Sequence, residues 1–327
     1  MLTEILGINE DSVLKAKDLL LSGDIVAMPT ETVYGLAAVA TDKNAVKKIF
    51  EVKGRPIDNP LIAHVHKDFP LETLVYIDND YVYELKRRFM PGPFTMVFRS
   101  KNVVCEEAVC GGDTLAVRIP SHEGCQKLLR AVNVPLVAPS ANLSKHTSPV
   151  TAKHVYADLN GKIPLILDGG KCGGGIESTV LDVTGSVPRI LRAGLITKEM
   201  IEDAVGKCEI AQHKDGDKVR SPGVKYRHYR PNCETALVGT AAEAVSLYEK
   251  EKAAGKTPYI MCDDEIAQSL TGYNVLNLGK TDKEIAFNLY DRLLEGEKKA
   301  DIVIAVSFNR EDGVYLGIMN RLRKSCG

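Results

Sequence analysis

The order of apolar and polar positions divides the chain into two regions of different character. In the first two hundred residues, short apolar runs typical of buried strands alternate irregularly with segments of helical periodicity. We predict strands at residues 25–28, 61–65, 94–99, 115–119, 135–138, 164–167, 179–183 and 189–192, and helices at about 11–21, 44–52, 81–89, 123–132, 151–159 and 197–205. Because strands and helices mix without strict βαβ alternation, we expect an α/β fold with a twisted mixed sheet.

A more regular alternation begins at Thr235. Strands are predicted at residues 236–238, 259–261, 275–278 and 302–306, with helices at 241–252, 282–295 and 313–323. This order indicates a small, parallel, doubly wound Rossmann-like domain, although no G-x-G-x-x-G follows its first strand. Between the two regions the pattern breaks down into a long connection. We therefore predict an N-terminal domain over 1–206, a linker over 207–233 and a C-terminal domain over 234–327.

Length and charge narrow the classes of protein. The 327 residues are enough for two domains that each bury a core. The net charge of -1 supplies no general basic field of the kind that drives nonspecific nucleic-acid binding. The N-terminus has acidic residues where a signal peptide has basic ones, and no apolar run approaches a membrane span. We expect a cytoplasmic protein that does not enter membranes.

The eight cysteines are scattered along the chain. They form no C-x-x-C pair, and no histidines cluster near them. A cytosolic chain of this length needs no disulfide framework. Free and mostly inert thiols are expected.

Two cations lie in the segment Lys53-Gly54-Arg55-Pro56, which ends a predicted helix. Pro56 disfavours a helical conformation at Arg55, so the backbone there is extended or turning. Upstream, the Pro-Thr-Glu-Thr turn at residues 29–32 carries hydroxyls and a carboxylate. The combination suits a small zwitterion next to a polyphosphate. An ordinary surface loop with two solvated cations is an equally good interpretation of Lys53 and Arg55 alone.

Further polar residues lie within or after apolar strands. Arg118 stands in Leu-Ala-Val-Arg-Ile-Pro and must be paired, either with a ligand carboxylate or in an internal salt bridge. For Arg192, a second arginine in a strand, the alternatives are a contact with phosphate and a structural ion pair. Ser140 and Asn142 follow a strand directly, where α/β sheets commonly bind ligands, although an ordinary turn has the same pattern. The glycines at 169–175 precede a strand rather than a helix, so they do not form a P-loop.

Five motifs together resemble a known family. PTETVYGL, KGRPIDNPL, PSAN, ESTVLD and SPGVKYRHYRP are similar to motifs of the two-domain threonylcarbamoyl-AMP synthases in the YrdC-like family. The resemblance implies an enzyme that forms threonylcarbamoyl-AMP and pyrophosphate from L-threonine, bicarbonate or CO2, and ATP. It implies Mg²⁺ bound through the ATP phosphates and assigns the ion no protein ligand. The product would pass to a tRNA threonylcarbamoyl transferase complex, and tRNA need not bind this chain directly.

The resemblance also implies roles for individual residues. Lys53 and Arg55 would be catalytic. The threonine-binding residues would be Thr32, His64, Arg118, Ala138, Ser178 and Thr179. The ATP-binding residues would be Lys53, Arg55, Asn59, Thr114, Ser140, Asn142, Ser148, Arg192, Tyr226 and His228.

The segment SPGVKYRHYRP would be a linker that closes over the nucleotide. The usual family form begins SPGM and ends HYAP, so Val224 and Arg230 depart from it. Contacts specific to position 230 are therefore left open. An alternative for the whole chain is a double-stranded RNA or tRNA-binding module without catalysis. The near-zero net charge argues against that alternative.

Overall fold

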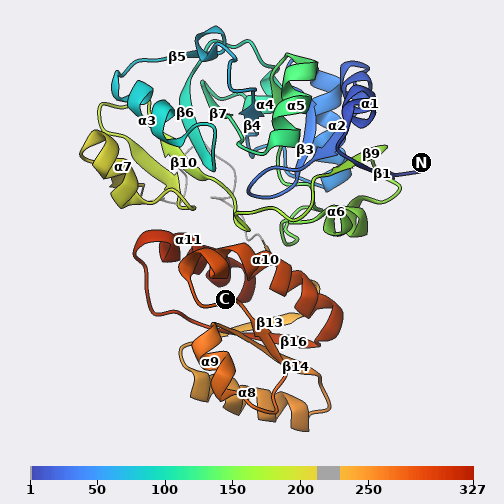
Figure 1. The fold of residues 1–327 in the computed structure, drawn as a ribbon, viewed down its shortest axis with the longest axis vertical. Coiled ribbons are helices and arrows are strands. Elements are labelled where there is room, and N and C mark those ends of the chain that lie inside the picture. The colour runs from blue at the N-terminus through green and yellow to red at the C-terminus, as the bar shows by residue number, and fades with distance from the viewer. Residues whose placement is uncertain (1, 212–228) are drawn as a thin grey trace.

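The computed structural model describes residues 2–211 and 229–327, which form two domains joined end to end (Figure 1). The strands of the N-terminal domain are β1 (Glu4–Gly7), β2 (Val26–Met28), β3 (Gly35–Val39), β4 (Ile62–His64), β5 (Val75–Tyr76), β6 (Phe94–Ser100), β7 (Thr114–Arg118), β8 (Leu136–Val137), β9 (Leu165–Asp168), β10 (Thr179–Asp182), β11 (Arg189–Arg192) and β12 (Glu209–Ile210). Its helices are α1 (Glu10–Leu21), α2 (Lys43–Lys53), the 3-10 turn Leu71–Thr73, α3 (Tyr81–Phe89), α4 (Glu106–Val109), α5 (Glu123–Val132), α6 (Ala152–Leu159) and α7 (Lys198–Val205).

One mixed sheet organises this domain. Its strand order is β1-β9-β2-β3-β8-β4-β7-β6-β10-β11-β12. The short strand β5 pairs with the C-terminal end of β6. Parallel pairs such as β4 with β7 lie next to antiparallel pairs such as β6 with β7. The expected twisted mixed sheet is therefore confirmed. Its last strand reaches Ile210, past the predicted domain boundary at residue 206.

Some elements depart from the sequence prediction. The pattern missed β1, β3, β5, β12 and α4 in this domain. The sequence of β3, GLAAV, is buried at all five positions, so it shows no alternation of apolar and polar side chains. Short elements such as four-residue α4 hold too few side chains to set a period. Elements with distinct signals, such as α6 behind its cap Thr151, lie where they were predicted.

The C-terminal domain contains β13 (Glu234–Val238), α8 (Ala241–Ala253), β14 (Pro258–Cys262), α9 (Asp264–Ser269), β15 (Val275–Asn277), α10 (Asp282–Lys299), β16 (Ile302–Val306) and α11 (Gly313–Cys326). Its four strands are all parallel, in the order β13-β16-β14-β15. Helices cover both faces, with α10 and α11 on the face toward the N-terminal domain (Figure 1). The predicted parallel domain is confirmed, and only the short helix α9 was missed.

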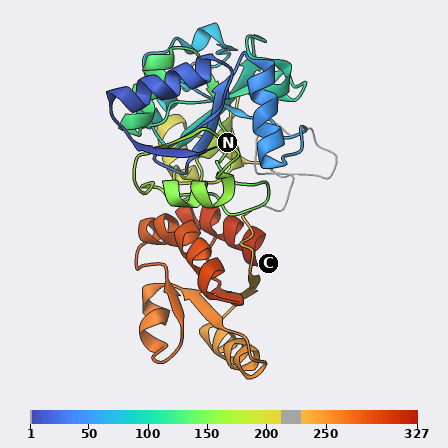
Figure 2. The same cartoon turned by 90° about the vertical axis from the view of Figure 1, so that its right-hand side faces the viewer.

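The layer of α10 and α11 packs against the N-terminal domain, close to α6 (Figure 2). Lys171 Nζ lies 2.7 Å from Asp291 Oδ2 of α10. Gly175 lies so close to α10 that a Cβ added there would fall 2.1 Å from the carbonyl oxygen of Ala286. Gly175 also has a φ of 71°, which disfavours other residues. This glycine loop is therefore shaped by its contact with the second domain.

The described residues include no helix that is both long and apolar enough to cross a membrane. Their eight cysteines are all free, as expected.

Candidate functional site

A cavity of about 70 Å³ lies at the ends of strands β4, β7 and β11 of the N-terminal sheet, next to Tyr229 in the segment that leads to the C-terminal domain. Ten of its lining residues belong to the N-terminal domain, and the eleventh, Tyr229, belongs to the linker. They are Val33, Arg55, Ile62, His64, Arg118, Ala138, Pro139, Ser140, Glu177, Arg192 and Tyr229. Six of these, Arg55, His64, Arg118, Ala138, Ser140 and Arg192, are predicted site residues. Its walls therefore combine both predicted ends of the site.

Strand register explains how distant segments meet at this cavity. His64 ends β4 and pairs with Arg118, which ends β7. Arg118 pairs with Thr95 on β6, Thr95 with Val180 on β10, and Val180 with Arg192 at the end of β11. These residues form one row across five neighbouring strands. The row places the predicted carboxylate-binding arginine and a predicted phosphate-binding arginine along the same edge.

Arg118 and His64 make up one end of the cavity. Arg118 is 4% exposed, and its Nη2 lies 2.8 Å from Glu31 Oε1 in an ion pair. The pair lacks hydrogen-bond geometry, so Arg118 Nε and Nη2 and both Glu31 oxygens make no hydrogen bond to a described residue. The two predicted roles of Arg118, an internal salt bridge and a contact with a ligand carboxylate, are therefore compatible. Arg118 pairs with Glu31 and still has N–H groups without a hydrogen bond to a described residue.

His64 is buried beside Arg118. Burial, together with the neighbouring Arg118 charge, lowers the pKa of His64 to about 3, so the ring is neutral at physiological pH. Its Nδ1 lies 3.0 Å from the carbonyl oxygen of Ile62. A neutral ring that donates to this carbonyl from Nδ1 keeps a lone pair on Nε2. His64 can therefore accept a hydrogen bond from a ligand in the cavity.

Arg55 and Arg192 supply positive charge at the other end. Arg55 Nη2 donates to the backbone oxygen of Asn59 at 3.1 Å. Burial lowers the pKa of Arg55 to about 10, which still leaves the guanidinium charged at neutral pH. Arg192 donates from Nε to the backbone oxygen of Ser178 and from Nη2 to its hydroxyl, both at 3.1 Å. Ser178 therefore fixes the direction of the Arg192 side chain.

Lys53 lies outside the cavity wall, although it stands two residues from Arg55. Gly54, with a φ of 58°, ends α2 and turns the chain between the two cations. The Lys53 ammonium is buried and donates to the backbone oxygens of Ser140 and Asn142. The structure thus gives Lys53 a direct contact with the PSAN loop, while Arg55 alone of the pair lines the cavity.

The remaining predicted residues divide into neighbours of the wall and more distant ones. Ser148 donates its hydroxyl to Glu177 Oε1 at 2.6 Å, and Asn142 donates to the carbonyl of His146 at 2.8 Å. The hydroxyl of Thr179 donates a hydrogen bond to the carbonyl of Ile196 at 2.6 Å. Thr32, Asn59, Thr114 and Thr179 are not among the lining residues. Tyr226 and His228 lie outside the described residues.

Five lining residues were absent from the predicted set, and two of them, Glu177 and Tyr229, have polar side chains. Glu177 belongs to the ESTVLD motif, and Tyr229 follows His228 in the linker motif, so both had a motif signal. Tyr229 is 5% exposed and stacks on Tyr290 of α10, with ring centroids 5.3 Å apart. That stacking partner is far away in the sequence and carries no motif signal.

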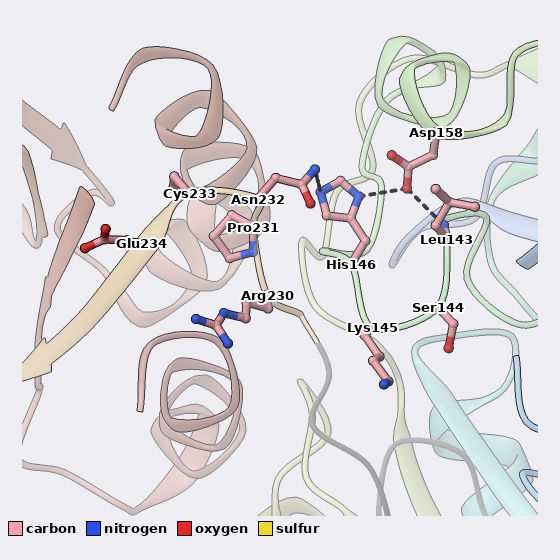
Figure 3. A pocket seen from close by; sticks show the side chains of 10 residues that line it. All are labelled: Leu143, Ser144, Lys145, His146, Asp158, Arg230, Pro231, Asn232, Cys233 and Glu234. Atoms are coloured by element: carbon pink, nitrogen blue, oxygen red, sulfur yellow. Dashed lines mark hydrogen bonds and ion pairs between the residues drawn. The ribbon is translucent and has the colours of Figure 1, made fainter. Parts of the chain in front are cut away.

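A larger cavity, of about 530 Å³, opens between the domains but contains none of the predicted site residues. His146 projects into it between Asp158 and Asn232 (Figure 3). Its Nδ1 lies 2.8 Å from Asp158 Oδ2, and its Nε2 lies 2.6 Å from Glu297 Oε2 on α10. This cavity marks an ionic contact between the domains rather than the predicted substrate site.

Comparison with known proteins covers both domains. Residues 18–194 match the Sua5/YciO/YrdC family model, described as "Telomere recombination", and residues 196–327 match "Threonylcarbamoyl-AMP synthase, C-terminal domain". Threonylcarbamoyl-AMP synthase of Pyrococcus abyssi is 41% identical over 98% of this chain and 95% of its own length. The Bacillus subtilis protein of the same name is 39% identical over 99% of this chain and 96% of its own length.

A solved structure is similar over both domains. The crystal structure of Pyrococcus abyssi Sua5 complexed with L-threonine has a TM-score of 0.91 and 39% identity. The similarity extends over 99% of this chain and 97% of the Pyrococcus abyssi chain. With the two family models and the relatives that match along nearly their whole length, the chain belongs to the family of two-domain threonylcarbamoyl-AMP synthases.

Proposed function

We propose that this protein forms threonylcarbamoyl-AMP and pyrophosphate from L-threonine, bicarbonate or CO2, and ATP, as a step in threonylcarbamoyladenosine modification of tRNA. One observation carries the proposal: a single cavity is lined by the neighbours His64 and Arg118 and also by Arg55 and Arg192, and Arg192 lies three strands away from Arg118 in the sheet. The names of the full-length relatives, one of them solved with L-threonine, support the same reaction. Because AMP is transferred from ATP, the enzyme would be a nucleotidyltransferase.

The end near Arg118 suits the amino-acid substrate. Arg118 Nε and Nη2 make no hydrogen bond to a described residue, and although Nη2 is ion-paired with Glu31, the two donors could bind the two oxygens of a threonine carboxylate. His64 Nε2 would accept a hydrogen bond from the substrate amine. The side chains of Val33 and Ile62 line the same cavity and offer an apolar surface to the threonine methyl group. We therefore expect this end to bind threonine in preference to serine.

The end near Arg55 and Arg192 suits the triphosphate. The threonine amine would first be carboxylated to a carbamate. A carbamate oxygen would then bond to the α-phosphorus of ATP while the bond from that phosphorus to the bridging oxygen breaks, releasing pyrophosphate. Such a displacement needs positioning and positive charge rather than a protein nucleophile. Arg55 and Arg192 would stabilise the charge that develops on the phosphate oxygens.

Magnesium would enter with ATP. Within the described residues, no group of three or more histidine, cysteine, aspartate or glutamate side chains could hold a metal ion. Glu177 is the acidic residue of the cavity wall, and Ser148, Tyr290 and Arg321 already engage its oxygens. The described residues thus offer no separate group of ligands for Mg²⁺, and we propose that the ATP phosphates would bind it.

The size of the cavity places a condition on ATP binding. A volume of about 70 Å³ is well below the roughly 300 Å³ or more of pockets that hold nucleotide-sized ligands. Tyr229 fills part of the wall on the linker side. We therefore propose that ATP enters with a displacement of Tyr229. The product would then pass to a tRNA threonylcarbamoyl transferase in the cytoplasm, without tRNA having to bind this chain.

The test is pyrophosphate release from ATP, Mg²⁺ and bicarbonate, with and without L-threonine. We expect release to require L-threonine, and serine to be about tenfold poorer because it lacks the methyl group. Release that is independent of the amino acid would overturn the proposal. Salt-sensitive retention of double-stranded RNA, without threonine-dependent release, would instead favour the RNA-binding alternative.

A further inference from the structure

Glu177 connects the wall of the cavity to the C-terminal domain. Its Oε1 accepts from the Ser148 hydroxyl at 2.6 Å. Its Oε2 accepts from the Tyr290 hydroxyl at 2.8 Å and from Arg321 Nε at 3.2 Å. Tyr290 lies on α10 and Arg321 on α11, so two of the three partners come from the second domain. A residue of the proposed active site is thus held by helices that do not line it.

Arg321 is a buried cation with 0% exposure. Besides Glu177, it donates from Nη1 to the backbone oxygen of Ala193, the residue after Arg192. Gly317, one turn earlier on α11, would place a Cβ only 3.4 Å from the Ala193 backbone. The close approach of α11 therefore lets the Arg321 guanidinium cross the domain boundary. Such a buried charge needs its partner, because an isolated one is strongly unfavourable.

Tyr290 and Arg321, which both bind Glu177, also contact the ring of Tyr229. Tyr290 stacks on the Tyr229 ring at a centroid distance of 5.3 Å and an interplanar angle of 27°. The Arg321 guanidinium lies 5.9 Å from the centroid of that ring. Glu177 and Tyr229 both line the cavity, whereas Tyr290 and Arg321 stand behind them. The C-terminal domain therefore supports two neighbouring parts of the wall.

The charges around the cavity indicate what this support achieves. Arg55, Arg118 and Arg192 line it together with one carboxylate, that of Glu177. Burial by itself would raise the pKa of Glu177, but Arg321 and Arg192 outweigh burial and lower it, so the carboxylate is ionised. Without Arg321, Arg192 and Lys324 would be the nearby cations that remain among the described residues, and of these two only Arg192 lines the cavity. A carboxylate drawn onto Arg192 would compete with phosphate for that guanidinium.

We propose that Arg321 and Tyr290 are positioning residues for the nucleotide end of the site, holding the Glu177 carboxylate against α10 and α11 and away from Arg192. The C-terminal domain thereby sets the affinity for ATP and leaves the affinity for threonine to Arg118 and His64. This inference rests on the proposed function, because it assumes that the arginine-lined end binds the triphosphate.

The experiment compares Arg321→Met, Arg321→Lys and the double variant Arg321→Met/Glu177→Gln in the full-length protein. The dissociation constant for ATP is measured by calorimetry, and both KM values come from pyrophosphate release. Arg321→Met should weaken ATP binding by about tenfold or more, with the threonine KM within about twofold. Arg321→Lys should lose less ATP affinity than Arg321→Met, because it keeps a positive charge beside Glu177 although it lacks the guanidinium geometry. The double variant should recover ATP affinity, because it also removes the stranded carboxylate.

A purely structural role would not give this selective loss and recovery. Arg323→Met is the matched control on the same helix, since Arg323 pairs with Glu311 on the surface. Equal losses for ATP and threonine, or no recovery in the double variant, would overturn the inference. If the wild type binds ATP but releases no threonine-dependent pyrophosphate, the proposed function fails while the ATP affinities still test Arg321. A wild type that does not bind ATP contradicts both.

Discussion

Lys53 and Arg55 stand two residues apart in one motif but contact different parts of the site. The Lys53 ammonium is buried against the backbone oxygens of Ser140 and Asn142. Arg55 lines the cavity and remains charged there. The left-handed conformation of Gly54 separates the two side chains. We infer that Lys53 shapes the PSAN loop, whereas Arg55 acts on the nucleotide.

These two positions give separable mutational effects. Lys53→Met should lower the free energy of unfolding by about 2–4 kcal/mol, because it leaves two carbonyls without their buried donor. Arg55→Met should change stability much less and should instead raise the ATP KM. Thermal unfolding and steady-state kinetics on both variants check this. Wild-type stability in Lys53→Met would show that the loop does not depend on the ammonium.

Several residues predicted at strand ends line the cavity, but the sequence did not predict where every side chain points. His64, Arg118 and Arg192 end strands that lie in one register row, so motif and topology agree. Lys53 has the same motif signal, yet its side chain reaches the loop instead of the cavity. Spacing along the chain cannot distinguish these outcomes, because a single glycine turn decides the direction of the side chain.

At the scale of single elements, helices and strands with a clear pattern of apolar and polar residues were predicted, and those without one were missed. Helices with a polar cap and a clear apolar face, such as α5 and α10, were anticipated from the sequence. The strand β3 was not, because a wholly buried run of small residues has no period of two. The pairing of strands distant in sequence, which creates the site, also lies beyond what local pattern can specify.

The glycine loop before β10 shows how one element constrains another. Gly175→Ala should destabilise the protein by about 2 kcal/mol or more, because its Cβ would collide with the α10 backbone at a position of positive φ. Gly173→Ala is the matched control, since no atom lies within 4 Å of its added Cβ. Chemical denaturation of both variants gives the comparison. Equal stability of the two would mean that the loop does not rest tightly on α10.

At the scale of the whole molecule, His146 forms an ionic bridge between the domains. Burial alone would lower its pKa, but hydrogen bonds to Asp158 and Glu297 outweigh burial and raise the pKa to about 9. Its side chain is only 10% exposed, so solvent screens these contacts weakly. The charged form is therefore favoured in the folded protein over the unfolded chain.

This bridge predicts a pH dependence of stability. A raised pKa means that the contribution of His146 is complete below about 6.5 and is lost as the pH rises through about 9. We expect His146→Gln to lose about 1–3 kcal/mol of stability at pH 6, and progressively less toward pH 10. Denaturation at several pH values measures this, with His66→Gln as the control. A loss that is constant across that range would argue against a charged bridge.

The contribution of the second domain could not be foreseen from sequence. Tyr290 and Arg321 lie 113 and 144 residues from Glu177, and a helical pattern indicates only that they face a core. Which surface that core belongs to depends on how the domains pack. The local prediction of a parallel domain was correct, but its contact with the proposed active site emerged only from the assembled fold.

The most direct test of the two-ended cavity is the pair of KM values in Arg118→Gln and Arg192→Gln, with exposed Arg189→Gln as the control. Arg118→Gln should raise the threonine KM about tenfold or more, with the ATP KM within about threefold. Arg192→Gln should show the opposite selectivity. If both variants changed the same KM, or if neither KM moved, the assignment of threonine and ATP to opposite ends of one cavity would be contradicted.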